Sequence, residues 1–214
     1  MAVTIDEITL SGDPEPWAAV GFALTDGVLQ LDGVTVRFVE RPPDRGMLGW
    51  SLRGAVSTSL DGLPTTSSTR PAPVADLGEH ANRVTAIDHI VAMSPNLERT
   101  VAALQAAGLD LRRIRGEPTP AGAPRQAFFR LGREILEVVQ EPEEVLSHAG
   151  HADRPARFWG LALLTQDLEL TVEAFGPNVS PIRAAVQPGR RIATVARTAG
   201  LSVPVALMSR EESG

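Results

Sequence analysis

An internal repeat constrains the fold of this chain more than any other feature of its sequence. The segment NLERTVAA (residues 96–103) recurs 71 residues later as DLELTVEA (residues 167–174), with five of eight positions identical and no gap. The same offset aligns the apolar stretches DHIVAM and WGLALL. A repeat of this kind predicts that one supersecondary unit occurs twice and that the chain is not a mosaic of unrelated elements.

Each copy of the repeat predicts the order strand, helix and three strands. In the first copy, the β-rich stretch TAIDHIVAM precedes a helix that Ser94 or Asn96 can cap. LDLRRIR then reads as a strand, and RQAFFRLG with REILEVVQ reads as a hairpin. In the second copy, RFWGLALL precedes a helix capped by Asp167, and RRIATVA and VPVALMS are the closing strands. The chain is therefore predicted to be an α+β protein of repeated βαβββ modules.

The N-terminal part has the pattern of a third, degenerate copy. IDEI (residues 5–8) matches IDHI (residues 87–90), so that Glu7 stands where His89 stands. We predict a degenerate module at residues 1–56, a Ser-, Thr-, Pro- and Gly-rich linker at 57–83, and paired modules at 84–142 and 156–210 within a domain spanning 84–214. A single module leaves an unfilled sheet edge, so it either covers the main domain or pairs with a second chain. A homodimer is the expected assembly.

Composition excludes several classes of function. The chain has no cysteine, and all 20 basic residues are arginine. Disulfides, thiol catalysis, Schiff-base lysines and a P-loop lysine are therefore excluded. The formal net charge of −6 argues against a nucleic-acid partner. No apolar run suits a membrane span and no secretory signal is evident, so we expect a cytoplasmic protein without a membrane partner.

The duplicated module resembles the vicinal oxygen chelate superfamily, which includes glyoxalase I, extradiol dioxygenases and bleomycin-resistance proteins. The resemblance rests on IDHIVAMSPNLERTVAAL, FFRLGREILEVVQ, FWGLALLTQDLELTVEAF and VPVALMS. It implies a cup-shaped antiparallel sheet with helices on the outside and a small molecule bound in the cup between modules. It also implies one divalent metal (Fe, Mn, Ni or Zn), held by residues of the first and last strand of each module. His89 and Glu137 stand at these positions in the first copy.

The second copy departs from that pattern. Gly160 stands at its first-strand position, and Ala206, Leu207 or Met208 at its last-strand position, depending on register. None of these suits a hard metal, whereas three protein ligands are usual at a catalytic centre. Glu7 is the candidate outside donor, from this chain or from a second chain.

Two functions of different class follow. The first is a metal-assisted lyase, isomerase or dioxygenase with His89 and Glu137 as catalytic residues. The second is a metal-free protein that binds or sequesters a drug or metabolite. Metal-free catalysis is also consistent with the pair, because a histidine and a glutamate suit proton transfer. Arginines of LRRIRGE are candidates for binding an anion. The predicted substrate-binding residues are Arg130, Phe128, Trp159, Met93 and Met208.

Overall fold

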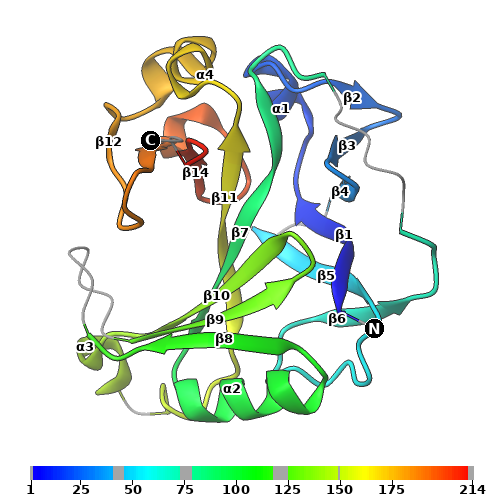
Figure 1. The fold of residues 1–214 in the computed structure, drawn as a ribbon, viewed down its shortest axis with the longest axis vertical. Helices are drawn as coiled ribbons and strands as arrows, with labels where there is room; N and C mark the ends of the chain where they lie inside the picture. Colours follow the sequence, from blue (N-terminus) through cyan, green and yellow to red (C-terminus); the bar gives the residue numbers. More distant parts are fainter. Residues whose placement is uncertain (1, 41–45, 73–78, 118–124, 149, 212–214) are drawn as a thin grey trace. The chain divides into compact units, whose positions relative to one another are not determined.

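The computed structural model describes residues 2–40, 46–72, 79–117, 125–148 and 150–211. Its first sheet contains β1 (Thr4–Ser11), β2 (Leu24–Thr25), β3 (Val28–Leu31), β4 (Val34–Val39), β5 (Met47–Arg53) and β6 (Thr65–Ser68). Its second contains β7 (Val84–Ser94), β8 (Asp110–Arg115), β9 (Gln126–Leu131), β10 (Glu134–Gln140), β11 (Arg157–Thr165), β12 (Arg183–Ala184), β13 (Arg191–Thr194) and β14 (Val205–Met208). The helices are α1 (Glu15–Ala19), α2 (Leu97–Ala106), α3 (Glu143–Leu146) and α4 (Leu168–Phe175), with short 3-10 turns at Gly176–Asn178 and Arg197–Ala199. These elements are labelled in Figure 1.

The second sheet repeats one strand order twice. Its order is β12-β13-β14-β11-β7-β10-β9-β8. In each copy the first strand (β7 or β11) lies beside the last strand (β10 or β14), and the two middle strands lie further out, towards the edge of the sheet. Pairing within the hairpins is antiparallel, whereas β7 pairs with β10, and β11 with β14, in parallel. The sheet is therefore mixed, and the duplicated βαβββ order predicted from the repeat is confirmed.

The helix caps of the two copies are also equivalent. The side chain of Asn96 accepts the Arg99 N–H at 3.0 Å, and that of Asp167 accepts the Leu170 N–H at 3.0 Å. An amide or carboxylate at this position satisfies a backbone donor that the helix itself leaves free. Among the described helices, none is long and apolar enough to cross a membrane.

The first sheet contains the same order once in full and once in part. Its order is β2-β3-β4-β1-β5-β6, so β1 to β4 form a complete module and β5 lies beside β1 as β11 lies beside β7. Trp50 N–H donates to Pro64 O at 3.1 Å, just as Leu161 N–H donates to Pro204 O at 3.0 Å. Strands β5 and β6 thus correspond to the first and last strands of a shortened fourth module. The sheet edge expected either to cover the main domain or to pair with a second chain is filled by β5 of this chain. A homodimer stays a prediction.

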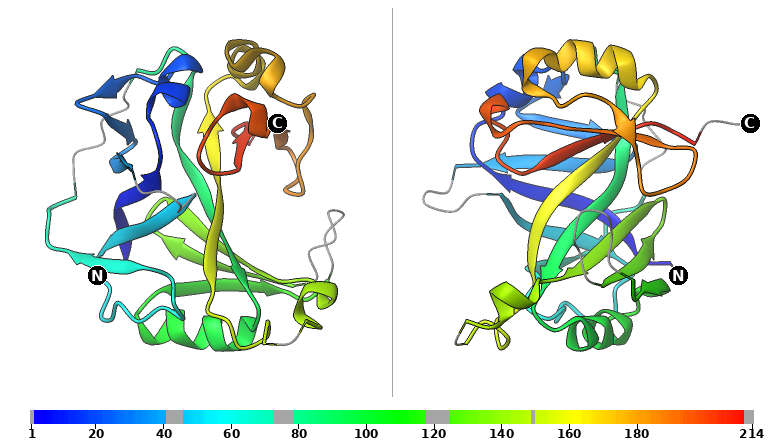
Figure 2. Two further views of the ribbon diagram at one scale, coloured as in Figure 1. Left: turned by 180° about the vertical axis from the view of Figure 1, so that it is seen from behind. Right: turned by 90° about the vertical axis from the view of Figure 1, so that its left-hand side faces the viewer.

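The stretch predicted as a linker contributes ordered structure. It carries β6, which pairs with β5, and two buried leucines, Leu60 and Leu63. Asp61 accepts hydrogen bonds from the Nε of Arg99 at 2.7 Å and from the Thr100 hydroxyl of α2. Figure 2 shows this cyan stretch running beside α2. Residues 73–78 of the predicted linker lie outside the described residues. The contacts of Asp61 are side-chain hydrogen bonds, which leave no apolar period in the sequence.

The chain divides into two compact units that are discontinuous in sequence. The first unit comprises residues 1–6, 49–70 and 89–159, and the second comprises 7–48, 71–88 and 160–214. Strands β1, β5, β7 and β11 pass from one unit into the other. In the second unit, His80 accepts the Ala23 N–H at 3.1 Å and contacts Gln30 O at 2.9 Å. Asn82, which is fully buried, donates to Val20 O at 2.9 Å, so the residues before β7 are fixed to the N-terminal module.

Candidate ligand-binding face

Strands β7, β10, β9 and β8 form one half of the second sheet, and one face of this half is covered by α2 and is buried. Ile90, Ala92, Phe129, Leu136 and Val138 have no exposed surface, and α2 lies beneath the three strands that follow it in the sequence (Figure 1). Side chains alternate between the two faces of a strand, so the intervening residues point away from α2. We call them the β7–β10 face: His89, Val91 and Met93 of β7, Ile135, Glu137 and Val139 of β10, Gln126, Phe128 and Arg130 of β9, and Asp110, Arg113 and Arg115 of β8.

Strand register arranges this face in rows that cross all four strands. Val91, Glu137, Phe128 and Arg113 form the central row. The next row begins at His89 and contains Ile135, Arg130 and Asp110, and the row on the other side contains Met93, Val139, Gln126 and Arg115. A β-bulge between Leu111 and Arg113 keeps Arg113 opposite Phe128. Polar and apolar side chains therefore alternate along the central row and are mixed in the two rows beside it.

His89, Glu137 and Gln126 form a chain of polar contacts on this face. The Nε2 of His89 lies 3.4 Å from Oε2 of Glu137, and the two side chains are 13% and 15% exposed. The Nε2 of Gln126 donates a hydrogen bond to Oε1 of Glu137. This contact orients the carboxylate toward the imidazole. An imidazole and a carboxylate held in contact can move a proton to or from a bound molecule.

The register identifies the equivalent positions in the last module. Ile90 pairs with Leu136 as Leu161 pairs with Val205, so His89 and Glu137 correspond to Gly160 and Ala206. A Cβ on Gly160 would lie 2.9 Å from the carbonyl oxygen of Pro204, closer than real Cβ contacts. The close approach of β14 therefore excludes a side chain at position 160 unless the backbone moves.

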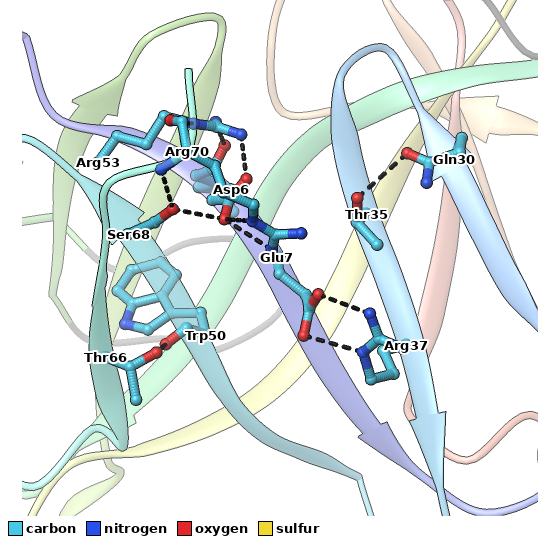
Figure 3. Close-up of polar contacts among 11 residues, drawn as sticks. Asp6, Glu7, Gln30, Thr35, Arg37, Trp50, Arg53, Thr66, Ser68 and Arg70 are labelled. Atoms are coloured by element: carbon cyan, nitrogen blue, oxygen red, sulfur yellow. Dashed lines mark hydrogen bonds and ion pairs between the residues drawn. The ribbon is translucent and has the colours of Figure 1, made fainter. Parts of the chain in front are cut away.

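The N-terminal module has an ion pair at the same positions. Ile8 pairs with Val36, so Glu7 and Arg37 correspond to His89 and Glu137. Arg37 donates from Nε and Nη2 to the two carboxylate oxygens of Glu7, each at 3.1 Å (Figure 3). This two-point pairing occupies the Glu7 carboxylate.

No known family model matches the sequence, and no curated protein matches it. Solved structures do match its fold. A mutant of 4-hydroxymandelate synthase from Streptomyces coelicolor aligns with 100% of this chain and 94% of its own, with a TM-score of 0.62 and 13% identity. A fusion of a xylose isomerase-like TIM barrel with 4-hydroxyphenylpyruvate dioxygenase aligns with 100% of this chain and 50% of its own, with a TM-score of 0.64 and 11% identity.

The chain has the vicinal oxygen chelate fold. Methylmalonyl-CoA epimerase from Mycobacterium tuberculosis also matches, over 59% of this chain and 89% of its own, with a TM-score of 0.47 and 18% identity. At these identities the likeness concerns the fold, and the chemistry has to be argued from this chain's own residues.

The residues present do not fit the divalent metal centre that this fold often carries. His89 and Glu137 are two ligands, and the equivalent Gly160 and Ala206 supply none. Among the described ranges, no group of three or more His, Asp or Glu side chains is placed to hold a metal ion. Glu7, the predicted outside donor, lies in the second unit and binds Arg37. These residues therefore do not support a chemical step that depends on a metal.

Three of the five predicted substrate-binding residues lie on the β7–β10 face with His89 and Glu137. These are Met93, Phe128 and Arg130. Trp159 is 48% exposed and adjoins Gly160 on β11, so the two point to opposite faces of that strand. Met208 is 1% exposed, within the core of the second unit. Binding roles for all five stay predictions.

Gln126 is the contact that sequence reasoning missed. Its position follows from hairpin register, which places it beside Val139 and one row from Glu137. Its Oε1 is buried and has no hydrogen-bond donor among the described residues. The signal available in the sequence was a polar residue at the start of an otherwise apolar strand, QAFF.

A second polar cluster lies at the start of β1. The carboxylate of Asp6, which is 3% exposed, accepts hydrogen bonds from Arg53, from the Ser68 hydroxyl at 2.7 Å and from the Nε of Arg70 at 2.7 Å (Figure 3). Arg53 also donates to Ile5 O at 2.6 Å. These contacts satisfy the carboxylate and join β1 to β5 and the end of β6, which indicates a structural role.

Two carboxylates with lowered pKa values lie at equivalent places in the repeat. A hydrogen bond from Arg125, with a second from the backbone, lowers the pKa of Glu98 in the first turn of α2. Arg191 and the backbone do the same to the pKa of Glu169 in the first turn of α4. Glu98 lies on the helix side of its sheet, opposite the β7–β10 face.

Proposed function

We propose that this glyoxalase-like protein binds a small organic molecule on the β7–β10 face without a resident metal. The observation that carries the proposal is the contact chain of His89, Glu137 and Gln126. A polar chain of this kind on a sheet face is expensive to maintain for stability alone, since each buried polar group has to be hydrogen-bonded. Apolar neighbours such as Val91 and Met93 surround it, as is usual in ligand sites.

The unsatisfied oxygen of Gln126 supports a ligand that donates a hydrogen bond. An amide oxygen without a donor costs about 1–3 kcal/mol when it is buried. If the oxygen and nitrogen of the Gln126 amide were exchanged, the amide oxygen would face the Glu137 carboxylate, and neither group could donate a hydrogen bond. The hydrogen bond to Glu137 therefore fixes the orientation of the Gln126 amide. A bound N–H or O–H group that reaches Oε1 would recover this cost.

Proton transfer by His89 and Glu137 is a second candidate function. The contact between them, with Gln126 orienting the carboxylate, is the arrangement of a general base and its positioning group. Isomerisation or elimination next to a carbonyl group requires such a base and no change of oxidation state. Metal-assisted chemistry would instead require further ligands from outside the described residues.

A binding assay and a metal analysis test the proposal together. We expect 2-naphthamide, an apolar probe with N–H donors, to bind by calorimetry and to raise the Tm, because a ligand of the native state stabilises it. Glu137→Gln and His89→Ala should weaken binding severalfold, and protein purified without chelator should contain metal well below one equivalent. A stoichiometric metal that is lost in His89→Ala would overturn the metal-free proposal. Absence of binding would overturn the binding proposal.

A further inference from the structure

We propose that the ligand of the β7–β10 face carries an oxyanion, bound by Arg113 and Arg130, next to an apolar body that packs on Phe128. The inference rests on the proposed function and adds the chemical class of the ligand. Carboxylate and phosphate are the two groups that share this chemistry, because both accept paired hydrogen bonds from guanidinium groups.

The charges on this face do not cancel. Arg113, Arg115 and Arg130 make no ion pair with any described residue. The carboxylates on the same face are engaged elsewhere. Asp110 pairs with Arg112 at 3.2 Å, and Glu137 contacts His89. The three arginines lie in three adjacent rows of this face, and only Arg130 has a carboxylate, that of Asp110, as its register partner. Such a group of guanidinium charges attracts an anion.

Other arginines of the first unit behave differently. Each of the following is paired with a carboxylate: Arg53 with Asp6, Arg99 with Asp61, Arg125 with Glu98, and Arg154 and Arg157 with Glu141. The chain has 26 acidic residues against 20 arginines, so counter-charges are not scarce. Among the described residues of the first unit, the arginines without an ion pair therefore lie on the face that also carries the His89–Glu137 contact.

The geometry lets two arginines share one anion beside an aromatic ring. The guanidinium carbon of Arg113 lies 5.0 Å from the ring centre of Phe128, its partner in the register. Arg130 lies two residues beyond Phe128 on β9 and on the same face. Diagonal neighbours across two strands have Cα atoms about 7–8 Å apart, within reach of two arginine side chains that converge on one anion. Phe128 is half-buried and offers its surface to the ligand's apolar body.

His89 and Glu137 lie within the span of the same molecule. Glu137 is directly opposite Phe128 in the register, on the side away from Arg113. Strands are about 4.8 Å apart, so the rows place Arg113 and Glu137 about 10 Å apart across the sheet. A molecule of one or two fused rings with one acidic group fits this span.

Calorimetry at low ionic strength with matched probes tests the inference. The probes are 2-naphthoate, its uncharged isostere 2-naphthamide, 2-naphthyl phosphate and inorganic phosphate. Either naphthyl anion should bind about tenfold or more tightly than the amide, since hydrogen bonds to charged groups exceed those to neutral ones by about this factor. The tighter of the two anions identifies carboxylate or phosphate.

Substitutions then assign the gain to named residues. Arg113→Gln and Arg130→Gln should each remove most of the advantage of the anions over the amide, so that the ratio of the two affinities falls towards one. Circular dichroism and a thermal melt show whether these variants are folded. Arg125→Gln, which removes a charge paired with Glu98 on the helix side of the same sheet, should change neither affinity.

Each alternative outcome is decisive. Equal affinities for amide and anions would overturn the anion inference and leave the proposed function standing. No binding of any probe would overturn both. Inorganic phosphate as tight as naphthyl phosphate would show that the apolar body contributes nothing and would overturn the role of Phe128.

Discussion

Replacing Gly160 by alanine should destabilise the protein although it adds only one methyl group. The new Cβ would lie 2.9 Å from Pro204 O, whereas ordinary contacts begin at about 3.4 Å, so the two strands must separate by about 0.5 Å. Pro204 O cannot yield freely, because it also accepts the Leu161 N–H at 3.0 Å. Overpacking of this kind costs about 1–3 kcal/mol, and the lower entropy of the unfolded chain returns about 0.4–1 kcal/mol.

The expected result is a free energy of unfolding lower by about 1–2 kcal/mol and a Tm lower by roughly 2–8 °C. Urea denaturation followed by circular dichroism measures the first and a thermal melt the second. Gly49→Ala should behave alike, since its Cβ would lie 2.9 Å from Pro64 O. Gly116→Ala is the matched control, because no atom of a described residue other than its chain neighbours lies within 4 Å of its Cβ position. A Gly160→Ala protein as stable as Gly116→Ala would refute the argument that backbone approach keeps position 160 free of a side chain.

Asp6→Asn should lower the free energy of unfolding by about 3 kcal/mol, because it leaves buried arginine charge without its partner. Glu7→Gln should cost no more than about 1 kcal/mol, because the side chain of its partner Arg37 is 46% exposed and solvent screens the pair. Urea denaturation of the two variants compares them, and equal losses would contradict this account. Because the pKa of Glu98 is lowered in the folded protein, its pairing with Arg125 stabilises at neutral pH and this contribution is lost as the pH falls through the folded pKa. Urea curves of the native protein and Arg125→Gln should therefore differ slightly at neutral pH and converge in acid, and a gap that widens in acid would reverse the sign. Asn96→Ala should cost about 1 kcal/mol through loss of the α2 cap, and an unchanged urea midpoint would show that Asn96 is not the effective cap.

Local pattern was sufficient to predict most elements. The repeat predicts both complete modules of the second sheet, and the caps at Asn96 and Asp167 lie where a polar residue precedes an apolar helical stripe. The strand that carries Glu7 follows from its match to IDHI. These predictions succeed because alternation and capping depend on residues close in sequence.

Contacts between distant segments were not predictable in the same way. Leu60 and Leu63 are buried in a stretch whose composition is that of a linker, and β6 there pairs with β5. Arg53 and Gln126 gain their partners from other strands. Sequence reasoning could name such polar residues but could not pair them, since hydrogen-bond partners depend on strand register.

The sequence by itself determined that the chain repeats a βαβββ module, that it lacks thiol and lysine chemistry, and that His89 stands at the first-strand position of one copy. Only the tertiary structure decided that Glu137 contacts His89 and that Gln126 orients the Glu137 carboxylate. It also decided that the carbonyl oxygen of Pro204 leaves no room for a side chain at Gly160. The physical reason is that periodicity is a property of neighbouring residues, whereas a site is formed by side chains that sheet register and backbone approach bring together.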